Sequence, residues 1–476
     1  MTTTSLTPTA RAATTPAATL TGLCDGAVHL PGDPGYDAAR VPWNVAVDQR
    51  PAAVALPRTV AHVQEVVRAA AAAGLRVAPQ STGHNAGPLA AQGLSDVVVV
   101  RTERMRGVTI DPTRRLARVE GGALWMDATE PAADHRLAAL HGSSPDVGIA
   151  GYSLGGGMGW YARQLGLAAN SLTAVELVTA DGEHVRADAT ENRELFWALR
   201  GGGGNFGVVT ALEFRLFPIE TAYAGMLVWD RDHAERVLRR WADWAPGAPD
   251  AVTTSFRFLD VPPLPTVPEP IRGRSLVVID GAVLGCDAEA RSILGLLRGL
   301  GPEIDTFGRM PARALPRLHL DPEGPTPAVS DSTLVGELGD AAIDTLLEQV
   351  GPGSTSSLLA AELRQLGGAL GRTPEEHGAL ARIDAAYAVF AVAVAATPEL
   401  AAQGQLDAER LTASLRPWST GRSYLNFAEN DVDVSTGYDA SVWRQLKGIR
   451  SALDPDDRFL ANHRVPRLFE DGAVTP

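Results

Sequence analysis

Three glycine-rich segments are the part of the sequence best suited to hold a ligand. They cover residues 79–87, 142–159 and 201–207, and the second of them contains seven glycines. Glycine adopts backbone angles that other residues avoid, and it lets main-chain N–H groups approach a ligand closely. Three such loops suit one extended polyanionic ligand, and a dinucleotide has that shape and charge. Tight turns between strands would use the same glycines.

Sequence signatures of other chemistries are incomplete. GYSLG at 151–155 has the spacing of a hydrolase nucleophile elbow, with His463 as a conceivable partner, but nothing else follows the hydrolase layout. The loop at 201–207 lacks the Lys-Ser/Thr pair of a P-loop, and the glycines at 155–159 lack the strand–turn–helix context of a Rossmann fingerprint. No His, Cys and carboxylate cluster has metal-ligand spacing, so we expect no metal.

Composition excludes several classes of partner. The chain has 476 residues, 45% of them hydrophobic, and a net charge of −14 with acids and bases interspersed. This balance argues against a nucleic-acid or anionic-membrane partner. Cys24 and Cys286 are too few for a disulfide framework. Residues 1–20 are rich in Thr, Ala and Pro without an apolar signal region, which predicts a disordered tail and a cytoplasmic location.

The elements that must position the glycine loops form an α+β unit over residues 21–220. An amphipathic helix at 59–73 is followed by strands at 75–79 and 95–101. Two hairpins follow, with turns at Pro112–Thr113 and Asp181–Gly182. A helix, the third glycine loop and a long strand then complete the unit.

A second α+β unit is expected over residues 221–418. Strand-like runs alternate there with helical runs, which predicts one antiparallel sheet with helices on one face. The helical runs are 232–245, 288–300, 340–350 and 399–415. Residues 261–270 are a proline-rich surface loop. The last segment, 419–476, is expected to hold a strand, a helix at 439–453 and a final loop, and to return to the first unit.

Several motifs in order resemble a known family. They resemble flavin-dependent oxidases of the vanillyl-alcohol oxidase/p-cresol methylhydroxylase fold, in the berberine-bridge-enzyme-like and 6-hydroxynicotine-oxidase-like branch. The similarity extends from about Gly35 to Val465. The motifs are RVPWN with RPAAVALP (40–57), STGHN (81–85), VEGGALW (119–125), PDVGIAGYSLGGGMG (145–159), ELFWALRGGGGNFGVV (194–209) and SYLNF (423–427) with DPDDRFLANH (454–463). The resemblance implies an FAD-binding domain of two subdomains over 21–220 and a substrate domain over 221–418.

The resemblance also implies how FAD is held. His84 matches the histidine that bonds covalently to the flavin 8α-methyl group. Many members have a cysteine before the proline that is Pro145 here, and it forms a second bond to the flavin; Ser144 stands there, so attachment through His84 alone is expected. The other positions that match cofactor-contacting residues are Gln80, Ser81, Thr82, Gly83, Asn85, Ala86, Val147, Gly148, Gly151, Tyr152, Asn205, Gly207, Val208 and Asn462.

Three residues are candidates for catalysis. Tyr424 matches a tyrosine that many members use or place near the flavin, and Asn426 should lie two residues on along the same strand face. Without the family, Tyr424 is equally well a half-buried strand aromatic. Glu362 could project from the substrate-domain sheet toward the flavin, or face solvent. A base at this site should reach the substrate O–H or N–H within hydrogen-bond distance.

The function that the resemblance implies is an FAD-dependent oxidase. It would take a hydride from a C–OH or C–N carbon of a small secondary metabolite and pass electrons to O₂, giving H₂O₂. Two alternatives remain: a flavin-dependent oxygenase or reductase, and a flavoprotein that sequesters a drug-like compound. The expected partners are a small-molecule substrate and O₂, with no nucleic acid or membrane, in a monomer or homodimer.

Overall fold

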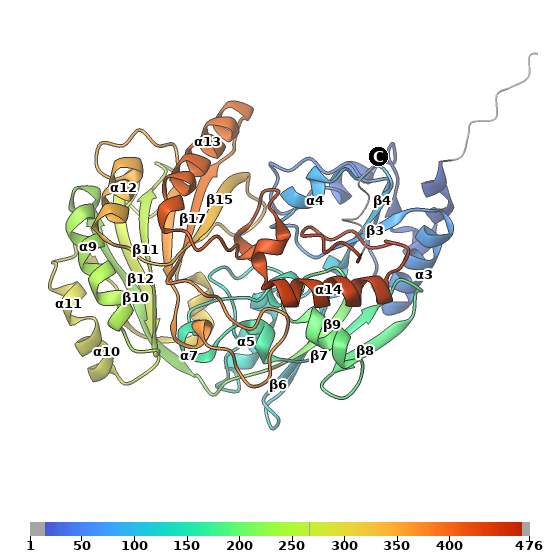
Figure 1. Cartoon of the computed structure of the whole chain (residues 1–476), viewed down its shortest axis with the longest axis horizontal. Helices are drawn as coiled ribbons and strands as arrows, with labels where there is room; N and C mark the ends of the chain where they lie inside the picture. The colour runs from blue at the N-terminus through green and yellow to red at the C-terminus, as the bar shows by residue number, and fades with distance from the viewer. Residues whose placement is uncertain (1–14, 266, 469–476) are drawn as a thin grey trace, which may run out of the picture.

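A computed structural model describes residues 15–265 and 267–468 and shows two lobes side by side (Figure 1). The predicted disordered tail falls largely on residues 1–14, which lie outside the described residues. Its remaining part is folded, because Pro16–Leu20 form a short 3₁₀ helix, η1, in which Leu20 is fully buried. The prediction of a disordered tail is therefore wrong for residues 16–20. No described helix is long and apolar enough to cross a membrane.

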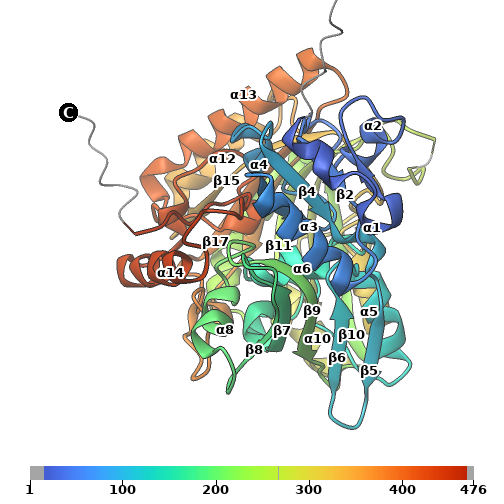
Figure 2. The same ribbon diagram turned by 90° about the vertical axis from the view of Figure 1, so that its right-hand side faces the viewer.

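The first lobe contains a four-stranded sheet of order β1-β2-β4-β3 and a five-stranded sheet of order β5-β6-β9-β7-β8 (Figure 2). The strands are β1 (Val28–His29), β2 (Ala53–Ala55), β3 (Arg76–Gln80), β4 (Val97–Arg101), β5 (Val108–Asp111), β6 (Leu116–Glu120), β7 (Leu172–Val178), β8 (His184–Asp188) and β9 (Val208–Arg215). The helices are α1 (Leu23–Gly26), α2 (Tyr36–Ala39), α3 (Val60–Ala72), α4 (Gly87–Ala91), α5 (Trp125–Ala133), α6 (Ile149–Leu154), α7 (Ala162–Leu165) and α8 (Arg193–Leu199).

Local sequence explains why α3 and β4 form where they do. The Thr59 side chain caps α3 by accepting a hydrogen bond from the His62 N–H at 3.2 Å. The helix stops just before Gly74, whose φ of +69° suits glycine. Every residue of β4 is buried, because parallel neighbours β2 and β3 pair with it on both sides. The helix predicted at 59–73 and the strands predicted at 75–79 and 95–101 are thus confirmed, with small differences at their ends.

The second lobe is built on an antiparallel sheet of order β13-β10-β12-β11-β16-β17-β15, with β14 paired to β10. Its strands are β10 (Thr221–Asp230), β11 (Val252–Asp260), β12 (Ser275–Val283), β13 (Ile304–Asp305), β14 (Gly308–Pro311), β15 (Ala328–Val335), β16 (Ala360–Gln365) and β17 (Tyr387–Val394). Its helices are α9 (Ala234–Trp244), α10 (Asp287–Ile293), α11 (Gly295–Arg298), α12 (Asp340–Val350) and α13 (Pro398–Ser414).

The helices of this lobe cover only one face of the sheet, as predicted (Figure 1). The core on that face combines Trp241 of α9 with Phe256 and Phe258 of β11 and Leu411 of α13. Since side chains alternate along a strand, the residues between these apolar positions face the first lobe. The expected helix over 288–300 is divided into α10 and α11, with the break at Leu294.

The C-terminal segment returns to the first lobe. Its helix α14 (Ala440–Leu453) lies against α8, and the chain then runs beside β3. There the Val77 N–H donates to the Arg458 carbonyl at 2.7 Å, and the Leu460 N–H donates to the Val77 carbonyl at 2.9 Å. One prediction for this segment is wrong: SYLNF is not a strand, because Leu425–Phe427 form a 3₁₀ turn, η9, preceded by extended backbone at Tyr424.

Candidate functional site

The three glycine-rich segments line one cavity between the lobes, with a volume of about 960 Å³. Its first-lobe wall comes from these segments, and its opposite wall comes from the bare face of the second-lobe sheet. Most of the predicted site residues line it: Gln80, Ser81, Thr82, Gly83, His84, Asn85, Ser144, Val147, Gly148, Gly151, Tyr152, Gly207, Glu362, Tyr424, Asn426 and Asn462. Ala86, Asn205 and Val208 lie behind this surface and do not line the cavity.

His84 is held in one orientation on the cavity wall. Its ring stacks on Trp43, with centroids 4.0 Å apart and planes 16° apart. Its Nδ1 lies 2.7 Å from Thr82 Oγ1, at hydrogen-bond distance. Its Nε2 is buried without a hydrogen-bond partner in the described chain and lies 3.8 Å from Asp146 Oδ1. One ring nitrogen of His84 is therefore anchored by a hydrogen bond, while the other has only a longer contact with the Asp146 carboxylate among the described residues.

Asp146 fixes the environment of His84. It accepts hydrogen bonds from Trp43 Nε1 at 2.7 Å, from the Gly324 N–H at 2.7 Å and from Ser144 Oγ at 2.9 Å. Burial alone would raise the pKa of its carboxyl, but His84, Gly324 and Trp43 outweigh burial and hold this pKa well below its ordinary value. Asp146 is thus a carboxylate that positions both Trp43 and the loop that carries Ser144.

The loop around His84 has the features of a cradle for a polar cofactor. Gln80 Oε1, Ser81 Oγ and Asn85 Oδ1 are buried and have no hydrogen-bond partner within the described chain. Buried polar atoms of this kind are rare unless a ligand or water satisfies them. A Cβ on Gly148 would stand 2.5 Å from Ser81 Oγ, so glycine there keeps the cradle open. These residues fit a dinucleotide such as FAD.

Asn205 holds the third glycine loop in place from behind. Its Nδ2 donates to the carbonyls of Gly202 at 2.8 Å and His463 at 2.9 Å, and its Oδ1 accepts from the Val465 N–H at 2.8 Å. Arg450 of α14 donates to the Asn205 carbonyl and to the Phe459 carbonyl. The Asn205 side chain therefore links the loop to the C-terminal segment.

Tyr424 and Asn426 converge, although they are not on a strand. Asn426 Nδ2 donates to the Tyr152 carbonyl at 2.9 Å and to Tyr424 Oη at 3.3 Å. Burial raises the pKa of Tyr424 to about 12, even though Asn426 and the main chain of Gly157 and Met158 act in the opposite direction. The Tyr424 phenol is therefore protonated at neutral pH.

Residues on the bare face of the sheet form rows across five strands, β17, β16, β11, β12 and β10. The register places Phe390, Glu362, Arg257, Val278 and Val228 in one row. The neighbouring row is Ala388, Arg364, Ser255, Asp280 and Met226. Charges thus lie together on the three middle strands. Glu362 is 5% exposed, so its interpretation as a solvent-facing residue is wrong.

The charged residues of the two rows pair with one another. Arg364 Nε donates to Glu362 Oε1 at 2.8 Å, and Arg257 Nη2 donates to Asp280 Oδ2 at 2.6 Å. His319 joins them, with its Nδ1 2.8 Å from Asp280 Oδ2 and its Nε2 3.6 Å from Glu362 Oε2. Burial and Arg257 would lower the pKa of His319, but nearby carboxylates raise it to about 9. We call Arg257, Asp280, His319, Glu362 and Arg364 the ionic cluster.

The ionic cluster limits what Glu362 can do. Burial would raise the pKa of its carboxyl, but Arg364 and His319 outweigh burial and hold that pKa well below its ordinary value. A carboxylate with so low a pKa is a weak general base, because proton transfer is favoured when the pKa lies near the working pH. Glu362 therefore fits a role in binding and in charge balance better than a role as a base.

Glu429 is a further group on the cavity wall that sequence reasoning missed. Its Oε2 accepts a hydrogen bond from Ser330 Oγ at 2.7 Å, and burial raises the pKa of its carboxyl from 4.5 to about 7. The main-chain carbonyl oxygen of Glu429 packs against Gly87. A Cβ on residue 87 would stand 2.3 Å from that oxygen, so glycine at this position permits the packing.

Glu429 should make stability depend on pH. Because the unfolded carboxyl loses its proton first, stability is expected to fall as pH rises from about 4.5 to about 7. The Glu429→Gln variant should lose this decline. Urea unfolding of both proteins at pH 5 and pH 8 measures the difference. Glu348→Gln, at an exposed position on α12, is the control and should follow the wild type; a Glu429→Gln curve parallel to the wild type would refute the prediction.

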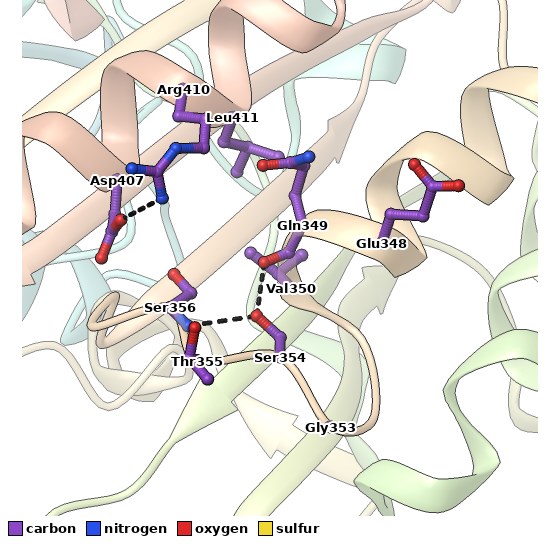
Figure 3. Close-up of a pocket in the computed structure, with 10 residues that line it drawn as sticks. All are labelled: Glu348, Gln349, Val350, Gly353, Ser354, Thr355, Ser356, Asp407, Arg410 and Leu411. Atoms are coloured by element: carbon purple, nitrogen blue, oxygen red, sulfur yellow. Dashed lines mark hydrogen bonds and ion pairs between the residues drawn. The ribbon is translucent and has the colours of Figure 1, made fainter.

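A second, smaller cavity lies between the end of α12 and α13 (Figure 3). Its volume is about 240 Å³, and its polar groups bond to one another. Ser354 Oγ donates to the Gln349 carbonyl at 2.5 Å, and Arg410 Nη1 lies 2.7 Å from Asp407 Oδ1. The Ser354 contact closes the loop after α12, and Ser357 joins that loop to Asp407 of α13, so this cavity is a structural feature of the turn rather than a candidate site. Among the described residues no group of His, Cys and carboxylate side chains could hold a metal ion.

Comparison with known proteins supports the interpretation of the large cavity. A family model for an FAD binding domain matches residues 51–188. The (R)-6-hydroxynicotine oxidase of Paenarthrobacter nicotinovorans is 29% identical over 456 residues, which cover 92% of this chain and 96% of that protein. The chain contains an FAD binding domain and is similar over nearly its whole length to this oxidase, which supports an FAD-dependent oxidoreductase.

Two other comparisons concern one part of the sequence and the overall fold. The xylooligosaccharide oxidase of Thermothelomyces thermophilus is 39% identical over 204 residues, which span 42% of this chain and only 41% of that relative. The solved structure of Physcomitrella patens BBE-like 1 has a TM-score of 0.81 and 22% identity, and covers 92% of this chain and 96% of that protein. This structural likeness establishes the two-lobe fold of the oxidoreductase.

Proposed function

We propose that this chain is an FAD-dependent oxidase whose flavin is attached through His84 alone. It would oxidise a C–OH or C–N bond of a small molecule, such as a secondary metabolite, with O₂ as acceptor and H₂O₂ as product. The observation that carries the proposal is the His84 ring, which lines the cavity, is stacked on Trp43 and has an Nε2 without a hydrogen-bond partner in the described chain. Ser144, at the position of the second attachment in related proteins, is hydrogen-bonded to Asp146.

The residues present would hold FAD along the first-lobe wall. Main-chain N–H groups of the loops at 80–85, 142–148 and 201–207 suit the pyrophosphate, because each loop presents bare backbone to the cavity. When bound, FAD supplies the acceptor for the substrate hydride. The C-terminal segment supports these loops, since Asn85 Nδ2 donates to the Leu425 carbonyl at 3.2 Å.

Tyr424 would bind the reacting O–H or N–H group of the substrate and take part in transfer of its proton. Asn426 donates to the Tyr424 oxygen, which favours the phenolate that forms as the proton passes on. The ionic cluster lies on the opposite wall, where Arg364 can bind a substrate oxygen while Glu362 balances its charge.

Acid precipitation combined with a peroxide assay tests this function. Yellow colour and flavin fluorescence are expected to stay with the denatured chain, and H₂O₂ is expected to form when alcohols and amines are supplied with O₂. Colour released to the supernatant would refute the attachment through His84. A chain purified without any flavin, or one that binds compounds stoichiometrically without peroxide formation, would refute the oxidase.

A further inference from the structure

The cavity continues beyond the ionic cluster into a compartment with apolar walls. Its floor is the outer part of the same sheet face, where Val228 of β10, Leu276 and Val278 of β12 and Leu259 of β11 lie together. The register explains this grouping, because Val228 is opposite Val278 and Leu259 is opposite Leu276. These side chains point away from the helix-covered core, which takes the alternate positions of the same strands.

The described residues of the proline-rich loop, 261–265 and 267–271, form the roof of this compartment. Val261, Val267 and Ile271 pack against the floor, and Leu264 also lines the cavity although it is 52% exposed. Prolines restrict the backbone of the loop, so its apolar side chains are presented with little loss of entropy on binding. We call this floor and roof the apolar compartment.

The position of the apolar compartment indicates which class of molecule can occupy it. It belongs to the same cavity as His84 and Tyr424, and it is separated from them by the ionic cluster. The cluster pairs its charges internally, and with His319 protonated its two arginines, histidine and two carboxylates leave about one net positive charge on this wall. A molecule that reaches Tyr424 past the cluster therefore has its polar end at the first-lobe wall and its other end among Val, Leu and Ile side chains.

We infer that the substrate is an amphiphile, with a reacting hydroxyl or amine at one end and an alkyl or aryl body that fills the apolar compartment. This inference rests on the proposed function and adds the substrate class to it. An oligosaccharide presents hydroxyl groups on all sides, and these would lose water without gaining partners on such walls. The substrate is therefore of a different class from the carbohydrates named for the xylooligosaccharide oxidase.

Calorimetric titration of the holoenzyme with 4-alkylphenols, from 4-ethylphenol to 4-hexylphenol, tests the inference. Each added methylene is expected to tighten Kd by roughly threefold as it is buried. Cellobiose, tested in the same way, is expected to bind at least tenfold more weakly than 4-hexylphenol. Binding that is independent of chain length, or tighter for cellobiose, would overturn the inference.

Two variants show whether the compartment is responsible. The double variant Leu264→Ser with Ile271→Ser changes only the surface loop and should abolish most of the chain-length dependence. Val278→Thr keeps the volume of the side chain and should weaken 4-hexylphenol more than 4-ethylphenol. Leu406→Ser, at an exposed leucine of α13 outside the cavity, is the matched control and should behave as the wild type. If Kd depends on alkyl chain length equally in the wild type and the three variants, the alkyl group binds elsewhere and the inference is overturned.

Calorimetry separates this inference from the proposed function. Carried out without O₂, it measures binding without steady turnover and does not require a flavin bond, so a missing peroxide signal does not affect it. Chain-length dependence in a protein that releases its flavin on acid precipitation would support the amphiphile while refuting attachment through His84. Peroxide formation from cellobiose, with no chain-length dependence for alkylphenols, would support an oxidase and overturn the amphiphile.

Discussion

Replacing Tyr424 with phenylalanine is expected to lower kcat by about a hundredfold or more, the usual contribution of a group that transfers a proton. Tyr424 is buried on the cavity wall, and its oxygen is a group to which Asn426 donates. Phenylalanine keeps the ring and its edge-on contact with Phe427 but removes the oxygen. Flavin content and thermal stability should therefore stay close to wild type while turnover falls.

The pH profile distinguishes proton transfer from mere packing. Because the pKa of Tyr424 is raised to about 12, wild-type kcat/KM should increase with pH up to the alkaline limit of the assay. The Tyr424→Phe variant should lose that increase. Tyr223→Phe is the matched control, since Tyr223 is equally buried but its hydroxyl accepts from Arg298 in the second-lobe core. A Tyr424→Phe variant with unchanged kcat, or with the wild-type pH profile, would rule out the role.

Replacing His84 with alanine is expected to abolish covalent flavin completely. The physical reason is that Nε2 of His84 is the buried, unpartnered nucleophilic nitrogen of the cradle loop, while Ser144 is engaged with Asp146. Acid-precipitated wild type should retain flavin fluorescence, and the variant should release its flavin to the supernatant. The native variant should still bind FAD reversibly, because the glycine loops remain.

The control for this experiment is an exposed histidine outside the cavity. His184 of β8 lies 3.1 Å from Thr210 Oγ1 and does not line the cavity, so His184→Ala should keep its covalent flavin. Flavin retained on the acid-precipitated His84→Ala chain would show that another residue forms the bond. Loss of flavin from both variants would show that the effect is general instability.

The glycine loops and His84 could be predicted because their chemistry is local. Residues 79–87, 142–159 and 201–207 are each recognisable without knowing the fold, and the cavity brings all three together. Glu362 and Arg364 carry a local signal too, since charges at i and i+2 of a strand share one face. The alternation of Arg257 with Phe256 and Phe258 carries the same signal, which could have identified this part of the ionic cluster.

Other parts of the site depend on contacts that no local pattern contains. The pairing of Arg257 with Asp280 requires the register of β11 and β12. His319 comes from a segment far from both residues in the sequence. The raised pKa of Glu429 follows from burial by the assembled lobes. The pattern of SYLNF predicts a strand wrongly, because a short apolar run has no decisive period. The 3₁₀ turn there is set by contacts such as that between Asn426 and Tyr152.

The pairing of Val77 with residues 458–460 has a consequence for protein synthesis. Until the ribosome has made those last residues, β3 is an open edge of its sheet, and the loop that follows it lacks the support of Leu425 and His463. A nascent chain can fold its second lobe earlier, but it cannot complete the flavin cradle. Loading of FAD is therefore a late event, and prematurely terminated chains should expose a strand edge that favours aggregation.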